Sequence, residues 1–344
     1  MHGHDVVGGC RYGVAMATDG EASAGGQPHD GLFRLVFSDP EHAGSELRSV
    51  LPRDLAARID LDRLVLQEGT FVDEVLRHRQ TDVLFSTRVS GRDAYLYVLI
   101  EHQSSPDPMM AFRMLTYQVR IWERQLAEHP QRGTRPLPII VPVVIYQGRR
   151  QWSAATDVAG LLDIDDELKA VAGELLPRFA YLLDDLTGVD DTALRMRPLT
   201  SAARMTFVLF ANAPDDADAT RWLVNWVDDL SDIDRRRLAG IFSYLVRVSV
   251  TPVDDLVRFA ATVGPVAEEV AMTTADQLIA QGEARGIASG RAGLLMDMLT
   301  LKFGELDVEV RRRIERATAE QIGEWSARLV QGAETIAAVL GSAG

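Results

Sequence analysis

The 344-residue chain has a single cysteine, Cys10, and it contains no run of 18 or more apolar residues. One cysteine excludes a disulfide or a cysteine-based zinc site within the monomer, which favours a reducing, intracellular setting. The missing apolar run predicts that no helix crosses a membrane. The N-terminus also lacks the charged and apolar regions of a signal peptide. We therefore expect a cytoplasmic protein that does not bind a membrane.

The chain also has fewer basic than acidic residues, 36 against 50, which gives a net charge of −14. This value argues against a protein that coats nucleic acid non-specifically. It does not exclude a nuclease, since the local field at the site governs binding. Residues 75–135 hold nine arginines against six acids, a local excess of three positive charges. The remaining composition, 47% hydrophobic and 25% charged, is that of a globular protein long enough for about two domains.

The most informative segment is a predicted β-hairpin that begins at Asp82. TDVLFSTRV and AYLYVLIEHQ flank the short polar segment SGRD, which is typical of a tight turn. If the turn centres on Gly91-Arg92, facing residues have numbers that sum to 183, and Asp82 faces Glu101. One face of the hairpin is then wholly apolar: Val83, Phe85, Leu96, Val98 and Ile100.

The other face of this hairpin places two acids together at one end. Side chains that face each other across two strands lie about 4.5–5.5 Å apart at Cβ, where like charges are destabilising. A divalent metal ion between Asp82 and Glu101 would relieve the repulsion, and Gln103 follows in phase with Glu101. The simpler alternative is that the two acids are solvated strand ends.

A second polar pattern lies on the helix expected over about residues 108–129. Arg113, Tyr117, Arg120 and Arg124 recur at spacings of four, three and four residues and so share one helical face. Arginine forks match phosphate oxygens, so this face is a candidate for contacts to DNA phosphates. A solvated helix face is the alternative, and Tyr117 would then be packed.

The remaining chain is predicted to begin with helices over residues 29–51 and to place a buried strand over residues 137–147, interrupted by Pro142. Helices are expected over 190–212, 219–230, 233–249 and 252–270. Gly282, Gly286 and Gly290 then recur every four residues, either as a smooth helix face for close approach or as a flexible linker. Phe303-Gly304 is expected to stop a helix.

Four segments, in order, resemble one known family: HDGLFRLVFSDPE, FVDEVLRHRQTDVLF, YVLIEHQSSPDPMMAFRMLTYQVRIWE and LPIIVPVVIYQG. They resemble the Rpn family of recombination-promoting nucleases and "putative transposases", assigned to the PD-(D/E)XK nuclease superfamily. The resemblance implies an α/β fold with a PD-(D/E)XK-like restriction-endonuclease core and a helical C-terminal half. The expected divisions are a disordered tail (1–28), the nuclease domain (29–190), a helical region (191–271), a Gly/Ala-rich linker (272–291) and a small helical module (292–344).

The superfamily pattern is an acid on one strand and acid-X-lysine on the next, which together hold a catalytic Mg²⁺. By this resemblance Asp82 and Glu101 are the two acids and metal ligands, and Mn²⁺ can substitute for Mg²⁺. Gln103, also expected to be catalytic, stands where lysine is usual. Glu74 is a candidate extra acid, although a surface glutamate is the more ordinary interpretation, and His102 is expected to be packed.

The resemblance thus predicts a metal-dependent DNA endonuclease that promotes recombination or serves mobile elements or defence. An inactive nuclease fold that binds DNA or protein is the alternative. A transposase with three catalytic acids is poorly supported, because the sequence has no third acid at a position that would complete the triad. We expect a homodimer through the helical C-terminal half, since cutting both strands of a duplex requires two sites.

Overall fold

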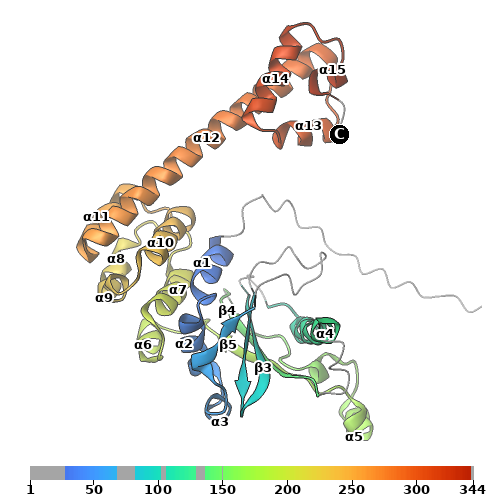
Figure 1. Ribbon diagram of the computed structural model, residues 1–344, viewed down its shortest axis with the longest axis vertical. Coiled ribbons are helices and arrows are strands. Elements are labelled where there is room, and N and C mark those ends of the chain that lie inside the picture. The colour runs from blue at the N-terminus through green and yellow to red at the C-terminus, as the bar shows by residue number, and fades with distance from the viewer. Residues whose placement is uncertain (1–27, 68–81, 102–105, 129–135, 149, 342–344) are drawn as a thin grey trace, which may run out of the picture.

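The computed structural model describes residues 28–67, 82–101, 106–128, 136–148 and 150–341. The lower body in Figure 1 contains a mixed five-stranded sheet, in the spatial order β1-β2-β3-β4-β5. The first three strands are antiparallel to their neighbours, whereas β3, β4 and β5 run parallel. The strands are β1 (Val65–Leu66), β2 (Asp82–Val89), β3 (Arg92–Glu101), β4 (Ile139–Tyr146) and β5 (Leu182–Asp185).

Helices cover both faces of this sheet, so that strand residues alternate between two apolar clusters. On one face the sheet packs against α1 (Pro28–Phe37), α2 (Pro40–Val50) and α7 (Ser201–Asn212). On the other face it packs against α4 (Met110–Glu128). The apolar face predicted for the hairpin is confirmed for Val83, Phe85, Leu96 and Val98; the side chain of Ile100 lies outside the described residues.

The predicted order of strand, strand, helix and strand is confirmed by β2, β3, α4 and β4. The expected break at Pro142 is wrong, because β4 continues through this residue, whose Cα partner is Tyr97. Shorter elements complete this part of the chain: α3 (Arg53–Ala56), η1 (Leu61–Arg63), η4 (Val158–Leu161), α5 (Asp166–Ala172), η5 (Gly173–Leu175) and α6 (Asp191–Met196).

The helical part that follows shares its core with the sheet. One apolar cluster extends from Phe85 in β2 through Phe207 to Ala271. Several expected helices are broken into shorter ones, and the helix expected over 252–270 ends at Gly264, whose φ of 148° is a left-handed value that favours glycine. The helices are α8 (Thr220–Leu223), η6 (Val224–Trp226), α9 (Val227–Ser231), α10 (Arg235–Val248) and α11 (Val253–Val263).

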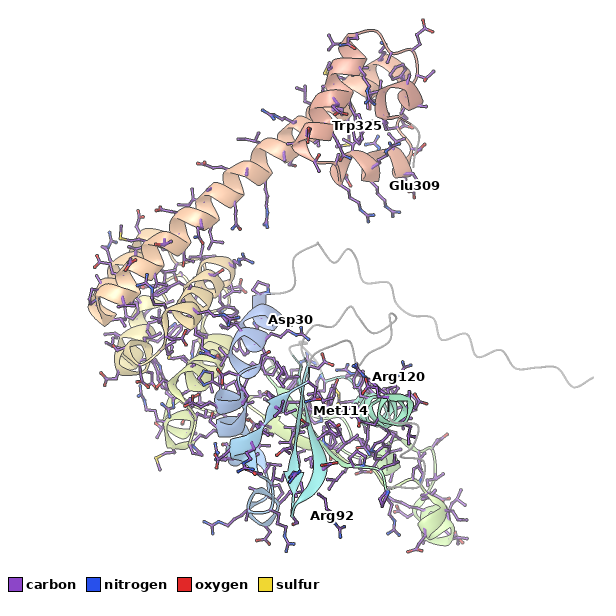
Figure 2. The ribbon with its side chains drawn as sticks, viewed as in Figure 1. Asp30, Arg92, Met114, Arg120, Glu309 and Trp325 are labelled. Atoms are coloured by element: carbon purple, nitrogen blue, oxygen red, sulfur yellow. The ribbon has the colours of Figure 1, made fainter. Side chains whose placement is uncertain are left out.

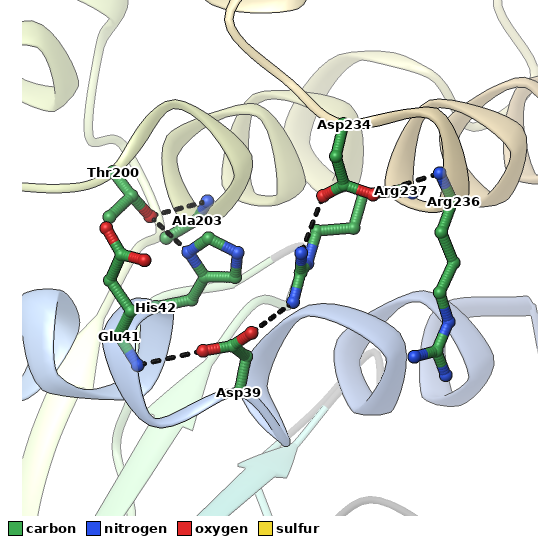
Figure 3. Close-up of polar contacts among 8 residues, drawn as sticks. All are labelled: Asp39, Glu41, His42, Thr200, Ala203, Asp234, Arg236 and Arg237. Atoms are coloured by element: carbon green, nitrogen blue, oxygen red, sulfur yellow. Dashed lines mark hydrogen bonds and ion pairs between the residues drawn. The ribbon is translucent and has the colours of Figure 1, made fainter.

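A polar junction joins the start of α2 to the starts of α7 and α10 (Figure 3). The Arg237 guanidinium bridges the carboxylates of Asp39 and Asp234, each of which also accepts from backbone N–H groups at a helix start. His42 shares a 2.9 Å hydrogen bond with the Thr200 hydroxyl. Because each carboxylate serves both a helix cap and an arginine, this junction holds the starts of α7 and α10 against the start of α2.

A 39-residue helix, α12 (Pro265–Phe303), leads away from this body to a separate apolar cluster (Figure 1). That cluster includes Trp325, which is buried on the second of the last three helices (Figure 2). They are α13 (Val308–Glu315), α14 (Ala319–Val330) and α15 (Ile336–Leu340). The predicted stop after Phe303 is confirmed by Gly304, with φ of 89°. Among the described helices, none combines the length and the hydropathy needed to cross a bilayer.

Candidate active site

The hairpin that positions the candidate site is present, but its register differs from the prediction. Val89 pairs with Arg92, so the turn consists of Ser90 and Gly91, with φ of 49° and 79°. Two-residue hairpin turns of this kind need positive φ at both central residues, which glycine adopts without steric cost. A turn over Gly91-Arg92 would instead force Arg92 into that conformation. Facing residues therefore sum to 181, and Asp82 pairs with Leu99 rather than Glu101.

The corrected register changes the relationship between the two predicted acids. Glu101 is two residues beyond Leu99, so its position is diagonal to Asp82 on the same face of the sheet. Diagonal neighbours are about 7–8 Å apart, which weakens the direct repulsion that the sequence argument assumed. Long side chains still reach one another at that spacing. The side chain of Glu101, and all of Glu74, His102 and Gln103, lie outside the described residues.

Asp82 itself is held at the edge of the sheet by two other side chains. The Tyr97 hydroxyl donates a 2.7 Å hydrogen bond to Oδ2 of Asp82. The guanidinium of Arg34, on α1, lies 3.9 Å from Oδ1 and donates to the Asp82 main-chain oxygen at 3.4 Å. Because the Asp82 side chain is only 16% exposed, these contacts restrict the directions from which a ligand can reach it.

Tyr97 is suited to act as a permanent donor to this carboxylate. Burial raises the pKa of the Tyr97 hydroxyl well above its usual value, and the charge of Asp82 adds to the shift. The hydroxyl therefore keeps its proton at neutral pH. Tyr97 also packs against Tyr117 on α4, with ring centroids 5.4 Å apart. A buried aromatic pair thus links the helix to the carboxylate.

The arginine face predicted on α4 is divided between the core and the surface. Tyr117 is buried under the helix, which argues against the predicted phosphate contact for this residue. Arg113 is turned in the same direction: it forms a 2.7 Å ion pair with Asp107, and its charge lowers the pKa of Tyr97. Arg124 pairs with Glu128 at 2.6 Å near the other end of the helix. Figure 2 shows Arg120 on α4 and Met114 on the side toward the sheet.

Sequence reasoning missed three of these residues, namely Tyr97, Arg34 and Asp107. A signal for Tyr97 was present, since residues 97, 99 and 101 alternate onto one face of β3. No local pattern indicated Arg34, because it reaches Asp82 from a helix 48 residues earlier in the chain.

The described part of the site supplies one carboxylate rather than a complete metal centre. Within the described residues, no three His, Cys, Asp or Glu side chains form a group that could hold a metal ion. Asp82 nevertheless fits such a role, because Oδ1 accepts no hydrogen bond from Tyr97 and carboxylate oxygens are preferred ligands of Mg²⁺. Glu101, at the end of the adjacent strand, is the residue that the sequence analysis predicts as the second carboxylate.

Residues 27–237 match the family described as "Putative transposase, YhgA-like". The chain is 38% identical over 167 residues to recombination-promoting nuclease RpnD of Escherichia coli O157:H7, covering 48% of this chain and 60% of RpnD. It is 42% identical over 122 residues to RpnC of E. coli K12, covering 35% of this chain and 39% of RpnC. It is thus similar to parts of two proteins that are named nucleases.

A longer match is to the inactive recombination-promoting nuclease-like protein RpnE of E. coli K12. The two chains are 30% identical over 273 residues, which is 76% of this chain and 85% of RpnE. No solved structure matches the chain. The family match over the whole sheet and the helices from α1 to α9, together with the long match to RpnE, shows that the chain belongs to the Rpn, or YhgA-like transposase, family.

Proposed function

We propose that the chain is a metal-dependent DNA endonuclease with a PD-(D/E)XK-like core. The observation that carries the proposal is the environment of Asp82, a restrained carboxylate at the sheet edge that accepts a hydrogen bond from a buried tyrosine. Glu101 follows at the end of the adjacent strand, diagonal to Asp82. The nuclease names of RpnD and RpnC support the same reaction class.

Asp82 and Glu101 would hold Mg²⁺ or Mn²⁺ in this proposal. Such an ion supplies charge stabilisation at the phosphate and lowers the pKa of bound water. Hydrolysis forms one P–O bond to water and breaks one P–O ester bond, so the attacking water loses a proton and the leaving oxygen gains one. Gln103 would orient the water or a phosphate oxygen by hydrogen bonding, without the positive charge that lysine brings to other superfamily members.

The chain's own residues would also organise the substrate. Tyr97 holds one oxygen of Asp82 in place, so that the other is directed to a ligand. Arg120 and Arg124 are partly accessible on the α4 face, and they would contact DNA phosphates. Arg113 forms an ion pair with Asp107 and would not contact DNA. It would instead hold the start of α4 beside Tyr97.

The test is cleavage of supercoiled plasmid by the purified full chain with Mg²⁺, Mn²⁺, Ca²⁺ or EDTA. Asp82→Asn and Glu101→Gln keep the size of each side chain and remove its charge. We expect nicking with Mg²⁺ or Mn²⁺ that EDTA abolishes and that each variant loses by at least 100-fold. Asp93→Asn, at the far end of the hairpin, is the matched control and should cut normally. Equal cutting by all four proteins would contradict the proposal.

The long match to RpnE favours a second candidate, a nuclease fold that binds DNA or protein without cutting. The two candidates differ in their response to metal. An active-type site predicts a rise in Tm with Mg²⁺ or Mn²⁺ that Asp82→Asn abolishes, because a ligand that binds only the folded state stabilises it. Metal-independent DNA binding, with neither cleavage nor a metal-dependent Tm, would favour the inactive module.

A further inference from the structure

Arg34 contributes to the candidate active site from a helix rather than from the hairpin. It belongs to α1, whose core-facing side chains are Leu32, Phe33, Val36 and Phe37. Because residues three and four apart share one face of a helix, the burial of these four fixes the rotation of α1 about its axis. The exposed side chain of Arg34 then projects from beside that face and reaches the first residue of β2.

The contacts between Arg34 and Asp82 leave most of the guanidinium unused. One nitrogen, Nη2, donates to the Asp82 main-chain oxygen at 3.4 Å and lies 3.9 Å from Oδ1. Both distances are long beside the usual length of a charge-assisted hydrogen bond, about 2.7–2.9 Å. A guanidinium carries several more N–H donors, and half of the Arg34 side chain is exposed. Positively charged donors are therefore open to solvent next to the shielded carboxylate.

Two other arginines near the hairpin are committed to different partners. Arg113 forms a 2.7 Å ion pair with Asp107, and its side chain is 14% exposed. Arg124 pairs with an acid one turn later, near the C-terminal end of α4. In the described part of the chain, Arg34 is the one basic side chain within ion-pair distance of Asp82. It is therefore the described cation best placed to meet a phosphate that approaches this carboxylate.

The proposed hydrolysis needs a positive charge that the predicted hairpin residues do not supply. Negative charge develops on the phosphate oxygens as water attacks, and a fixed donor aimed at these oxygens lowers the barrier. Gln103, which lies outside the described residues, takes the place of the usual lysine and is neutral. An arginine fork can bind two phosphate oxygens at once. The half-exposed guanidinium of Arg34 has the charge and the free donors for this role.

We propose that Arg34 binds a phosphate group of DNA at Asp82 and supplies the positive charge that Gln103 lacks. The inference rests on the proposed function, because it assigns a residue to the same phosphodiester substrate. Arg34 would donate hydrogen bonds to the non-bridging phosphate oxygens and would transfer no proton. Its contact with the main-chain oxygen of Asp82 keeps the guanidinium beside the carboxylate.

A structural role is the alternative, in which Arg34 only ties α1 to the start of β2. The two roles differ once the carboxylate of Asp82 is neutralised, because Asp82→Asn removes the ion pair and keeps the main-chain oxygen. A structural tie then affects stability alone. A phosphate contact also affects the affinity for DNA and its dependence on salt, since each contact contributes about 0.9 to the slope of log K against log salt.

The first experiment measures binding of a labelled duplex by fluorescence anisotropy in EDTA over a range of KCl concentrations. Asp82→Asn is the parent, and Asp82→Asn/Arg34→Gln is compared with Asp82→Asn/Arg48→Gln. Arg48 is the matched control, because its side chain is similarly exposed and pairs with Asp62 instead. We expect only the Arg34 change to weaken binding, by about fivefold or more, and to reduce the slope by about 0.9. Matching far-UV circular dichroism verifies folding. Unchanged affinity and slope, or no binding by the parent, would overturn the proposal.

The second experiment measures cleavage of supercoiled plasmid at saturating Mg²⁺ and DNA. Removal of a donor to developing charge costs about 100- to 1000-fold in rate, so Arg34→Gln should cut at least about 100-fold more slowly than wild type. Arg34→Lys keeps the charge without the fork and should retain more of the rate, and Arg48→Gln should cut normally. Removal of a cation beside Asp82 favours metal binding, so a lost metal cannot explain the slower cutting. Wild-type cutting by Arg34→Gln would refute the role of Arg34.

Together the experiments separate this inference from the proposed endonuclease. If the wild-type chain does not cut DNA but the Arg34 change still lowers the affinity and the salt slope, the endonuclease fails and the phosphate contact stands. If the wild-type chain cuts DNA and Arg34→Gln binds and cuts equally well, the endonuclease stands and the inference about Arg34 fails.

Discussion

The Tyr97 hydroxyl and the Asp82 carboxylate form a 2.7 Å hydrogen bond that joins the middle of β3 to the first residue of β2. The tyrosine is buried and its pKa is raised, so it remains a donor over the whole physiological pH range. Hydrogen bonds to a charged acceptor contribute about 1.5–3 kcal/mol. This bond therefore restrains a side chain that the proposed chemistry needs in one orientation.

Removal of that donor in Tyr97→Phe should reduce plasmid cleavage about 10-fold and raise the Mg²⁺ concentration needed for half-maximal stabilisation. The ring and its contact with Tyr117 remain, so we expect the fold to persist. Tyr181→Phe removes a comparable hydroxyl, bonded to the Ala155 carbonyl, and is the control. If both variants responded to Mg²⁺ in the same way, Tyr97 would have a structural role only.

Arg34 is expected to oppose metal binding at Asp82, because its guanidinium lies 3.9 Å from the carboxylate and is half exposed. Partly exposed pairs of this kind are worth about 0.2–1 kcal/mol. Arg34→Ala should therefore lower the half-saturating Mg²⁺ concentration about 1.5- to 5-fold, measured by the shift in Tm during a metal titration. Arg48→Ala, which removes an arginine paired with Asp62 elsewhere, should leave the metal response unchanged. A higher Mg²⁺ requirement in Arg34→Ala would contradict this prediction.

The hairpin could be predicted from the sequence because alternating apolar residues and a Ser-Gly turn are local signals. Its register could not be fixed with the same assurance, since a shift of the turn by one residue changes every facing pair. The Ser90-Gly91 turn requires a positive φ at Ser90, and serine gives no sequence signal for that conformation. The facing partner of Asp82 shifts by two residues, from Glu101 to Leu99, which leaves the alternation of side chains unchanged. Asp82 and position 101 therefore still lie on the same face of the sheet.

Contacts between distant segments were beyond the reach of local patterns. The α4 periodicity placed Tyr117 correctly on a face with three arginines, but only the packing against Tyr97 shows that this face turns inward at Tyr117. The bridge between Arg237 and Asp39 joins residues 198 positions apart. In both cases the tertiary structure determines which residues meet, and the spacing of residues along the chain does not.

Gly148, just after β4, is expected to tolerate no side chain. A Cβ at this position would lie 1.9 Å from the hydroxyl oxygen and 2.2 Å from Cζ of Tyr146, a buried ring with little freedom to move. Overpacking of this kind costs about 1–3 kcal/mol. Gly148→Ala should therefore lower the free energy of unfolding by at least that amount in urea titrations. Gly31→Ala, in α1 with nothing within 4 Å, should instead be neutral or stabilising, because alanine favours a helix.

Glu46 should make the stability of the protein depend on pH. It is buried beside Asp184 and Arg197, and Arg197 donates two hydrogen bonds to Asp184 while lying 3.9 Å from Glu46. Burial raises the pKa of Glu46 well above 4.5, and the nearby charge of Asp184 adds to the shift, whereas Arg197 opposes it. The guanidinium is thus committed mainly to Asp184.

Between pH 4.5 and the raised pKa, the folded protein keeps a proton on Glu46 that the unfolded chain has lost. The free energy of unfolding should therefore fall by up to about 1.4 kcal/mol per pH unit as pH rises through this range. Glu46→Gln is neutral at every pH and should remove that part of the slope, as urea titrations from about pH 5 to pH 8 would reveal. Exposed Glu167→Gln is the control and should retain the wild-type slope. If Glu46→Gln and wild type gave parallel curves, Glu46 would be ionised in the folded protein, and Arg197 would then have to neutralise two buried carboxylates.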